Sequence, residues 1–144
     1  MAKQFPIYIV EDDEDDLLLL RYCLQRSEVR IPFEFQGNGE AFITFLQSNP
    51  EARNKTFIVL LDLKMPRIDG FEVLAWLKKQ TDFSQNPVVI LSSSNLQEDV
   101  QKAYALGANW YIQKPRTLEE YQVMIQRLVH FCEEISLSSN EFLS

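Results

Sequence analysis

The stretch PIYIVEDDEDD (residues 6–16) passes from a short apolar segment directly into six consecutive acidic residues. The almost wholly aliphatic run at 7–10 is typical of a parallel β-strand that is covered on both faces. The acids that follow carry like charges, which repel one another when they are crowded. Their position at the end of a buried strand therefore needs a physical explanation.

Working outward from this stretch, strand-like and helix-like segments alternate along the chain. The expected strands are Ile7–Val10, Phe33–Gln36, Ile58–Leu61, Val88–Leu91 and Trp110–Gln113. Apolar residues spaced three or four apart mark the first four helices, in the groups Leu17/Leu20/Cys23/Leu24, Phe42/Phe45/Leu46, Val73/Leu74/Leu77 and Val100/Ala103/Tyr104. This alternation predicts an α/β fold, a doubly wound five-stranded parallel sheet in the flavodoxin-like order 2-1-3-4-5 with helices on both faces.

The last helix is expected to run from Leu118 to Leu137. Thr117 and Glu120 form a capping box in which Glu120 reaches back to the Thr117 amide. The stripe facing the sheet should contain Tyr121, Ile125, Leu128, Val129 and Cys132. Met124, Phe131 and Ile135 form a second apolar line about 80° round the helix, and this line predicts a homodimer or a partner-docking surface on the last helix.

Composition narrows the class of protein. With 144 residues, of which 46% are hydrophobic, the chain suits one domain (residues 1–144, core about 5–135, short tail at 136–144). The net charge of −7 disfavours direct nucleic-acid binding. No apolar run is long enough to cross a membrane and the N-terminus does not have the form of a signal peptide, so a cytoplasmic location is expected. Residues 49–56 are expected to form an extended polar loop.

Cysteine and histidine usage exclude several kinds of site. Cys23 and Cys132 lie on apolar helical stripes, which favours buried thiols over a disulfide or a zinc site. His130 is the only histidine, so a histidine-dependent triad is hard to build, and a surface position is expected for it.

Five polar side chains follow the carboxyl ends of the predicted strands, which is where ligands bind in doubly wound sheets. They are Glu11, Asp12, Asp62, Ser92 and Lys114. Converging carboxylates favour Mg²⁺, which prefers oxygen ligands and offsets their repulsion. Asp13 to Asp16 have another explanation, because acids in a first helical turn interact well with the helix dipole. An EF-hand is excluded because no glycine follows at the sixth loop position.

Four motifs in this order carry a family resemblance. IVEDD (9–13), LLDLKMPRIDG (60–70), ILSS (90–93) and YIQKP (111–115) resemble the receiver domain of two-component response regulators, over about residues 5–135. The long polar loop before the third strand is similar to that of the stand-alone regulators that pair with cyanobacterial phytochromes.

The resemblance implies a phosphorylation site. Asp62 would accept a phosphoryl group from the phosphohistidine of a sensor histidine kinase. Phytochrome-type sensors are among the kinases that the resemblance implies. Mg²⁺ would be held by Asp12, Asp62 and the Lys64 backbone carbonyl, with Glu11 acting directly or through water. Lys114 would pair with the carboxylate and then with the phosphoryl oxygens.

The resemblance also implies a switch and a mode of output. The Ser92 hydroxyl would bind the phosphoryl group, and Tyr111 would turn inward when Ser92 moves. Lys114–Pro115 is expected to be a cis peptide bond, as in the family. The protein would signal through protein contacts or a phosphorelay and would not be a turnover enzyme. Lys64, two residues after Asp62, and Ser94, which offers no carboxylate to orient water, predict slow autodephosphorylation.

Simpler roles and rival functions remain open for these residues. Lys114 could be a surface cation, Tyr111 could pack on the sheet, and Asp62 could cap the next segment. A haloacid-dehalogenase-type phosphatase needs an acid where Lys64 stands, and a flavodoxin-like flavin carrier needs a phosphate-binding loop where the six acids stand. A degenerate receiver that only binds proteins is disfavoured by the intact Asp62 and Lys114.

Overall fold

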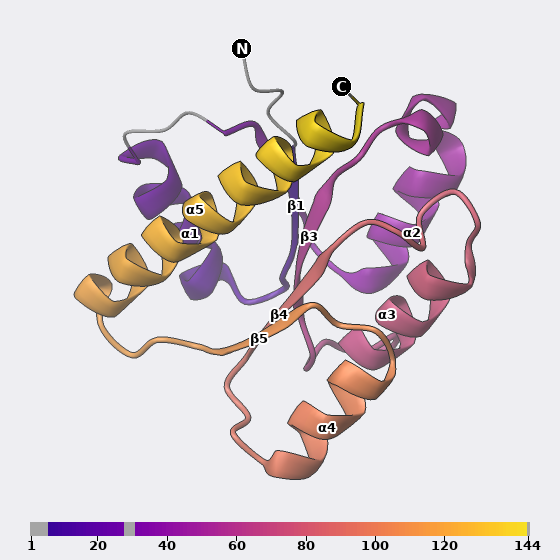
Figure 1. Cartoon of the computed structure of the whole chain (residues 1–144). Coiled ribbons are helices and arrows are strands. Elements are labelled where there is room, and N and C mark those ends of the chain that lie inside the picture. The colour runs from indigo at the N-terminus through magenta and orange to yellow at the C-terminus, as the bar shows by residue number, and fades with distance from the viewer. Residues whose placement is uncertain (1–5, 28–30, 144) are drawn as a thin grey trace.

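The computed structural model describes residues 6–27 and 31–143, with side chains for all of these except residue 54 and residues 135–143. Five parallel strands form one sheet in the order β2-β1-β3-β4-β5 (Figure 1), which confirms the predicted fold. The strands are β1 (Ile7–Val10), β2 (Phe33–Gln36), β3 (Ile58–Asp62), β4 (Val88–Ser92) and β5 (Trp110–Gln113). β3 and β4 are one residue longer than predicted, so Asp62 and Ser92 are the last residues of their strands.

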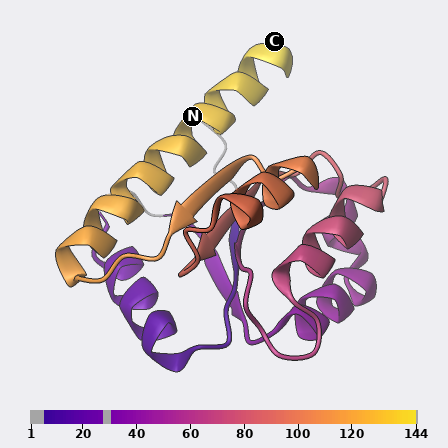
Figure 2. The same cartoon turned by 90° about the horizontal axis from the view of Figure 1, so that it is seen from below.

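The helices cover both faces of the sheet. They are α1 (Glu14–Gln25), α2 (Gly39–Ser48), the short 3-10 helix η1 (Pro50–Asn54), α3 (Gly70–Lys79), α4 (Gln97–Ala105) and α5 (Leu118–Leu143). Helices α1 and α5 lie on one side of the sheet, and α2 and α3 lie on the other (Figure 2). Side chains cap the N-termini of four helices: Asp13, Asn38, Asp69 and Thr117 each accept a hydrogen bond from the backbone amide three residues later.

Two separate cores explain why the central strands are apolar throughout. Ile7 and Ile9 pack with α1 and α5, whereas Val10 packs with α2 and α3. The same alternation continues in the neighbouring strands, where Ile58 and Leu60 face α1 and α5 and Val59 and Leu61 face the other helices. Successive side chains of a strand point to opposite faces, so a sheet buried on both sides needs an apolar residue at nearly every position.

Both cysteines are buried free thiols, as predicted. They belong to the core that α1 and α5 form with the sheet. Burial is the main cause that raises the pKa of the Cys132 thiol to about 12. His130 is exposed and lies 3.0 Å from Glu134, one helical turn on.

Three sequence-based expectations about backbone structure are wrong, and a fourth is half correct. Helix α5 continues to Leu143, where a short tail was expected, because an established helix gains one hydrogen bond for each residue added and serine opposes this only weakly. The supposed loop at 49–56 contains η1, which proline opens. The Lys114–Pro115 bond is trans, the isomer that X-Pro bonds still prefer. The capping box is only half correct: Thr117 caps the helix through the Glu120 amide, but the Glu120 side chain accepts its hydrogen bond from the Arg116 amide and not from that of Thr117.

The second apolar line on α5 is mostly used inside the molecule. Met124 is 5% exposed and belongs to the core, while the Phe131 ring packs on Trp110 of β5 at 5.7 Å between centroids. Ile135 lies outside the residues with described side chains. In the described part of the chain, no helix, α5 included, has both the length and the apolar character needed to cross a bilayer.

Gly70 allows α3 to begin directly against the end of β3. Its amide donates a hydrogen bond to the Leu63 carbonyl at 2.9 Å. A Cβ atom at residue 70 would collide with the Asp62 carbonyl oxygen and lie 2.6 Å from the Leu63 Cα. Both are backbone atoms that cannot rotate away, so this contact fixes the position of the Asp62 backbone.

We therefore expect Gly70→Ala to lower the free energy of unfolding by about 1–3 kcal/mol, the usual range for overpacking. Gly37→Ala is the matched control, because a Cβ there meets nothing within 4 Å, and it should change stability by less than about 0.5 kcal/mol. Urea denaturation of both variants measures the difference. Equal stability of the two would show that the close approach at Gly70 is not a constraint.

Candidate functional site

An acidic cluster lies where the carboxyl ends of β1 and β3 meet. Glu11 and Asp12 follow β1, and Asp62 ends β3. One carboxylate oxygen from each of these three residues lies within 4.8 Å of the others. Glu11 and Asp62 are buried, and Asp12 is exposed. The predicted convergence of these three acids is therefore present.

Lys114 brings a positive charge into the same cluster from the end of β5. Its ammonium lies 2.7 Å from Glu11 Oε1, 2.7 Å from Asp16 Oδ2 and 3.3 Å from Asp62 Oδ2. The contacts with Asp16 and Asp62 have hydrogen-bond geometry, and the contact with Glu11 is a close ion pair. The lysine side chain is only 13% exposed, which excludes the interpretation that it is a free surface cation.

Asp16 is a member of the cluster that the sequence does not predict, since an acid in the first turn of a helix is already explained by the helix dipole. One of its oxygens faces Lys114, and the other accepts a hydrogen bond from the Tyr121 hydroxyl at 2.9 Å. A signal was available in the sequence. Asp16 stands four residues before Leu20, in line with the buried stripe of α1.

Charge and burial oppose each other in this site. Burial, together with a hydrogen bond to Asp62, raises the pKa of the Glu11 carboxyl despite the opposing effect of Lys114. Burial also disfavours the charged form of Lys114, but the close carboxylates of Asp16, Glu11 and Asp62 outweigh it and raise the pKa of the lysine. Lys114 is therefore a firmly charged ammonium, and its single positive charge does not balance the three carboxylates that it contacts.

Ser92 and Tyr111 lie beside the cluster and are engaged with Ser94. The Ser92 hydroxyl, fully buried, accepts a hydrogen bond from the Ser94 amide at 3.1 Å. The Tyr111 hydroxyl donates to the Ser94 carbonyl at 2.9 Å, and its ring is half-buried. The Lys114 amide donates a hydrogen bond to the Ser92 carbonyl at 2.7 Å, but among the described residues the Ser92 hydroxyl itself has no hydrogen bond to Asp62 or Lys114. The hydroxyl of Ser94 donates to Asp99 at 2.6 Å.

The segment after Asp62 orients its carboxylate. Asp62 Oδ1 accepts a hydrogen bond from the Lys64 amide at 3.2 Å, and the Lys64 side chain is exposed. The start of α3 is capped by Asp69 instead, so capping a helix is not the role of Asp62. Its second oxygen faces Lys114.

The donor set of the cluster fits a hard divalent cation. Glu11, Asp12 and Asp62 offer carboxylate oxygens, the ligands that Mg²⁺ and Mn²⁺ accept. One of the three is exposed, which leaves room for the waters that such ions retain. The single ammonium leaves an excess of negative charge that a divalent cation would compensate.

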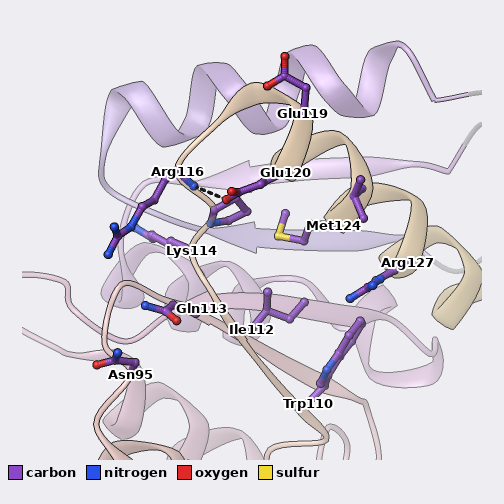
Figure 3. Close-up of a pocket in the computed structure, with 12 residues that line it drawn as sticks. Asn95, Trp110, Ile112, Gln113, Lys114, Arg116, Glu119, Glu120, Met124 and Arg127 are labelled. Atoms are coloured by element: carbon purple, nitrogen blue, oxygen red, sulfur yellow. Dashed lines mark hydrogen bonds between the residues drawn. The ribbon is translucent and has the colours of Figure 1, made fainter.

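A groove runs between β5 and α5 next to the cluster (Figure 3). Trp110 and Ile112 of β5 line one side, and Val123, Met124 and Arg127 of α5 line the other. In this view Lys114 and Arg116 lie toward the left and Trp110 and Arg127 toward the right. The dashed line in Figure 3 is the hydrogen bond from the Arg116 amide to Glu120.

Comparison with known proteins agrees with this geometry. Residues 7–126 match the model of the response regulator receiver domain. The chain is 35% identical over 127 residues to the response regulator Rcp1 of Synechocystis sp., which covers 87% of this chain and 86% of that protein.

Solved structures of similar regulators superimpose on most of the chain. The Mn²⁺-bound form of Rcp1 has a TM-score of 0.78 at 35% identity, over 90% of this chain and 95% of that one. The phosphorylated cyanobacterial phytochrome response regulator RcpA has a TM-score of 0.80 at 30% identity, over 90% and 94%. The bacteriophytochrome response regulator AtBRR has a TM-score of 0.67 at 31% identity, over 86% and 91%.

Proposed function

Since the chain belongs to the response regulator receiver domain family, we propose that it accepts a phosphoryl group on Asp62 from a sensor histidine kinase. The observation that carries the proposal is the arrangement of Asp62, whose two oxygens face the Lys64 amide and the Lys114 ammonium. Receiver domains are phosphoacceptors, and we propose no turnover reaction for this one.

In the proposed transfer, an Asp62 carboxylate oxygen attacks the phosphorus atom of the phosphohistidine. The new P–O bond forms as the P–N bond breaks, and the electron pair of that bond returns to the kinase imidazole. Transfer of this kind depends mainly on positioning and charge neutralisation. Lys114 supplies a charge beside the oxygen, and the Lys64 amide holds the other oxygen in place.

We propose that Glu11, Asp12 and Asp62, with the Lys64 backbone carbonyl, hold Mg²⁺. When bound, the cation neutralises charge on the phosphoryl oxygens. Support comes from the close carboxylate oxygens and from the Mn²⁺-bound form of Rcp1. The role of this chain's residues is to present hard oxygen ligands at the strand ends and to keep Asp62 oriented.

The proposed switch links Ser92 to Tyr111. The Ser92 hydroxyl is expected to leave the Ser94 amide and donate to a phosphoryl oxygen. Because Tyr111 binds the carbonyl of the same Ser94, a shift of this loop changes the position of the tyrosine. The output would pass through protein contacts or a phosphorelay.

The partner is proposed to be a phytochrome-type histidine kinase, with residues 1–144 acting as one receiver domain. The similarity to regulators named for phytochromes and bacteriophytochromes supports this choice. The alternative is a receiver that binds proteins without phosphorylation. The fully assembled cluster of Asp62, Glu11 and Lys114 favours the phosphoacceptor.

Acetyl phosphate with Mg²⁺ tests the proposal directly. We expect a single phosphoryl adduct by intact mass, lost in Asp62→Asn, and strongly reduced by chelation of the metal or by Asp12→Ala. Asp15→Asn is the control, because it removes a nearby exposed charge outside the carboxylate cluster. An unmodified wild-type protein, or an adduct that persists in Asp62→Asn, would leave the phosphorylation-independent alternative.

The phosphoaspartate is proposed to be long-lived. The exposed Lys64 side chain begins two residues after Asp62 and can cover the phosphoryl group against water. Residue 94 is the second position from which a side chain could orient the attacking water. The Ser94 hydroxyl there donates its hydrogen bond to Asp99, so it does not orient the water.

Lys64→Asn should therefore shorten the lifetime of the phosphorylated protein. The decay of the adduct, followed by intact mass after removal of the phosphodonor, measures it. Lys79→Asn, a change of the same charge at an exposed position on α3, should decay like the wild type. Slower decay in Lys64→Asn than in the control contradicts shielding by the lysine.

A homodimer through α5 is also proposed, with its contact surface revised. Met124 and Phe131 are used inside the molecule, but Leu118 and Val123 are 38% and 48% exposed. Val123 lines the groove beside the edge strand β5 together with Ile112. An exposed apolar residue beside an edge strand suits a second copy.

We expect Val123→Glu to convert a wild-type dimer to a folded monomer by light scattering. Gln122→Glu adds the same charge at the neighbouring exposed position, outside the groove, and should remain dimeric. A wild type that is monomeric with and without phosphorylation refutes the dimer. A dimer that persists in Val123→Glu refutes this contact surface.

A further inference from the structure

Asp16 connects the ammonium of Lys114 to a buried tyrosine of α5. Its Oδ2 atom lies 2.7 Å from Lys114 Nζ, and its Oδ1 atom accepts a hydrogen bond from the Tyr121 hydroxyl at 2.9 Å. The Asp16 side chain is 21% exposed. Tyr121 is 2% exposed and packs in the core between the sheet, α1 and α5.

The lysine needs an anchor of this kind. Its four-carbon stem has many accessible rotamers, so the ammonium is positioned only as well as its partners hold it. Asp62 is not the main anchor, since its contact at 3.3 Å is longer than the two contacts at 2.7 Å with Glu11 and Asp16.

The two close partners differ in their relation to the proposed cation. Glu11 belongs to the group of carboxylates suited to hold a metal, together with Asp12 and Asp62, and Asp16 does not. A cation in the cluster would compete with Lys114 for Glu11. Asp16 therefore holds the ammonium by a contact that does not also serve the cation.

Tyr121 in turn fixes Asp16. Each carboxylate oxygen of Asp16 has one partner, the ammonium on one side and the tyrosine hydroxyl on the other. Rotation of the carboxylate would break both contacts. Because the tyrosine ring is enclosed in the core, its hydroxyl is a rigid support.

We propose that Asp16 is a positioning residue of the phosphorylation site, which holds Lys114 ready for the phosphoryl group transferred to Asp62 and is itself held by Tyr121. The inference rests on the proposed function and adds a residue to it. It also predicts that α5 affects the rate of phosphorylation, because the Tyr121 hydroxyl holds Asp16 in place.

The test measures phosphorylation rate against acetyl phosphate concentration, with Mg²⁺, in the wild type, Asp16→Asn, Tyr121→Phe and the double variant. In this reaction the Asp62 oxygen bonds to phosphorus as the phosphorus–acetate oxygen bond breaks, and acetate leaves with the electron pair. Asp16→Asn should lower the maximal rate about tenfold, below the ~100-fold that a 1 Å displacement can cause. The half-saturating donor concentration should change little, because the lysine acts on the transferring group.

Tyr121→Phe should lower the maximal rate less, since Asp16 remains charged but loses one support. The double variant should be no slower than Asp16→Asn alone, because the tyrosine acts through the aspartate. Asp15→Asn, which removes an equal charge from an exposed position in the same helical turn, should match the wild type. Urea denaturation of each variant confirms that the assays contain folded protein.

The outcomes separate this inference from the proposed function. If the wild type gains no phosphoryl group on Asp62, the proposed function fails. If the wild type is phosphorylated and both Asp16→Asn and Tyr121→Phe retain its maximal rate, the positioning role is overturned. A stability loss without a rate change, or rate effects that multiply in the double variant, would likewise overturn it in favour of two independent structural roles.

Discussion

One ammonium group shared by three carboxylates is the interaction on which the rest of this site depends. Lys114 faces Glu11, Asp16 and Asp62 at the edge of the sheet where β1, β3 and β5 end. Without it, buried acids would lie close together with no compensating charge inside the protein, and burial of unpaired charges is strongly unfavourable. Burial is the main cause of the raised pKa of the Glu11 carboxyl, and the neighbouring Asp62 raises it further. The remaining negative charge gives the site its suitability for a divalent cation.

Two features of the backbone make that arrangement possible. The strand order places β1 and β3 side by side, so that the acids after β1 meet Asp62. The absence of a side chain at Gly70 lets α3 start against the Asp62 and Leu63 backbone. The apolar strands, buried on both faces, hold this edge rigidly, because each successive residue anchors the sheet to a different layer of helices.

Helix α5 belongs both to the core and to the surroundings of the site. Its buried face carries Tyr121, which reaches Asp16, while Val123 borders the groove on the other side of the helix. A change at the carboxylate cluster and a change at the surface of α5 are thus separated by few contacts. Lys114 lines the same groove as Val123, so the carboxylate cluster and the proposed contact surface of α5 border one another.

The sequence alone was sufficient to predict the sheet order and the convergence of Glu11, Asp12 and Asp62. The alternation of strands and helices and the position of a residue at a strand end are both local patterns. In a doubly wound fold, residues at the carboxyl ends of neighbouring strands lie close together. It was not sufficient for Asp16, whose partners Lys114 and Tyr121 are about a hundred residues away along the chain. Nor was it sufficient for Met124 and Phe131, whose apolar line faces neighbours and not solvent. Helical spacing tells which side chains share a face, but only the packing of α5 against α1 and β5 decides what that face meets.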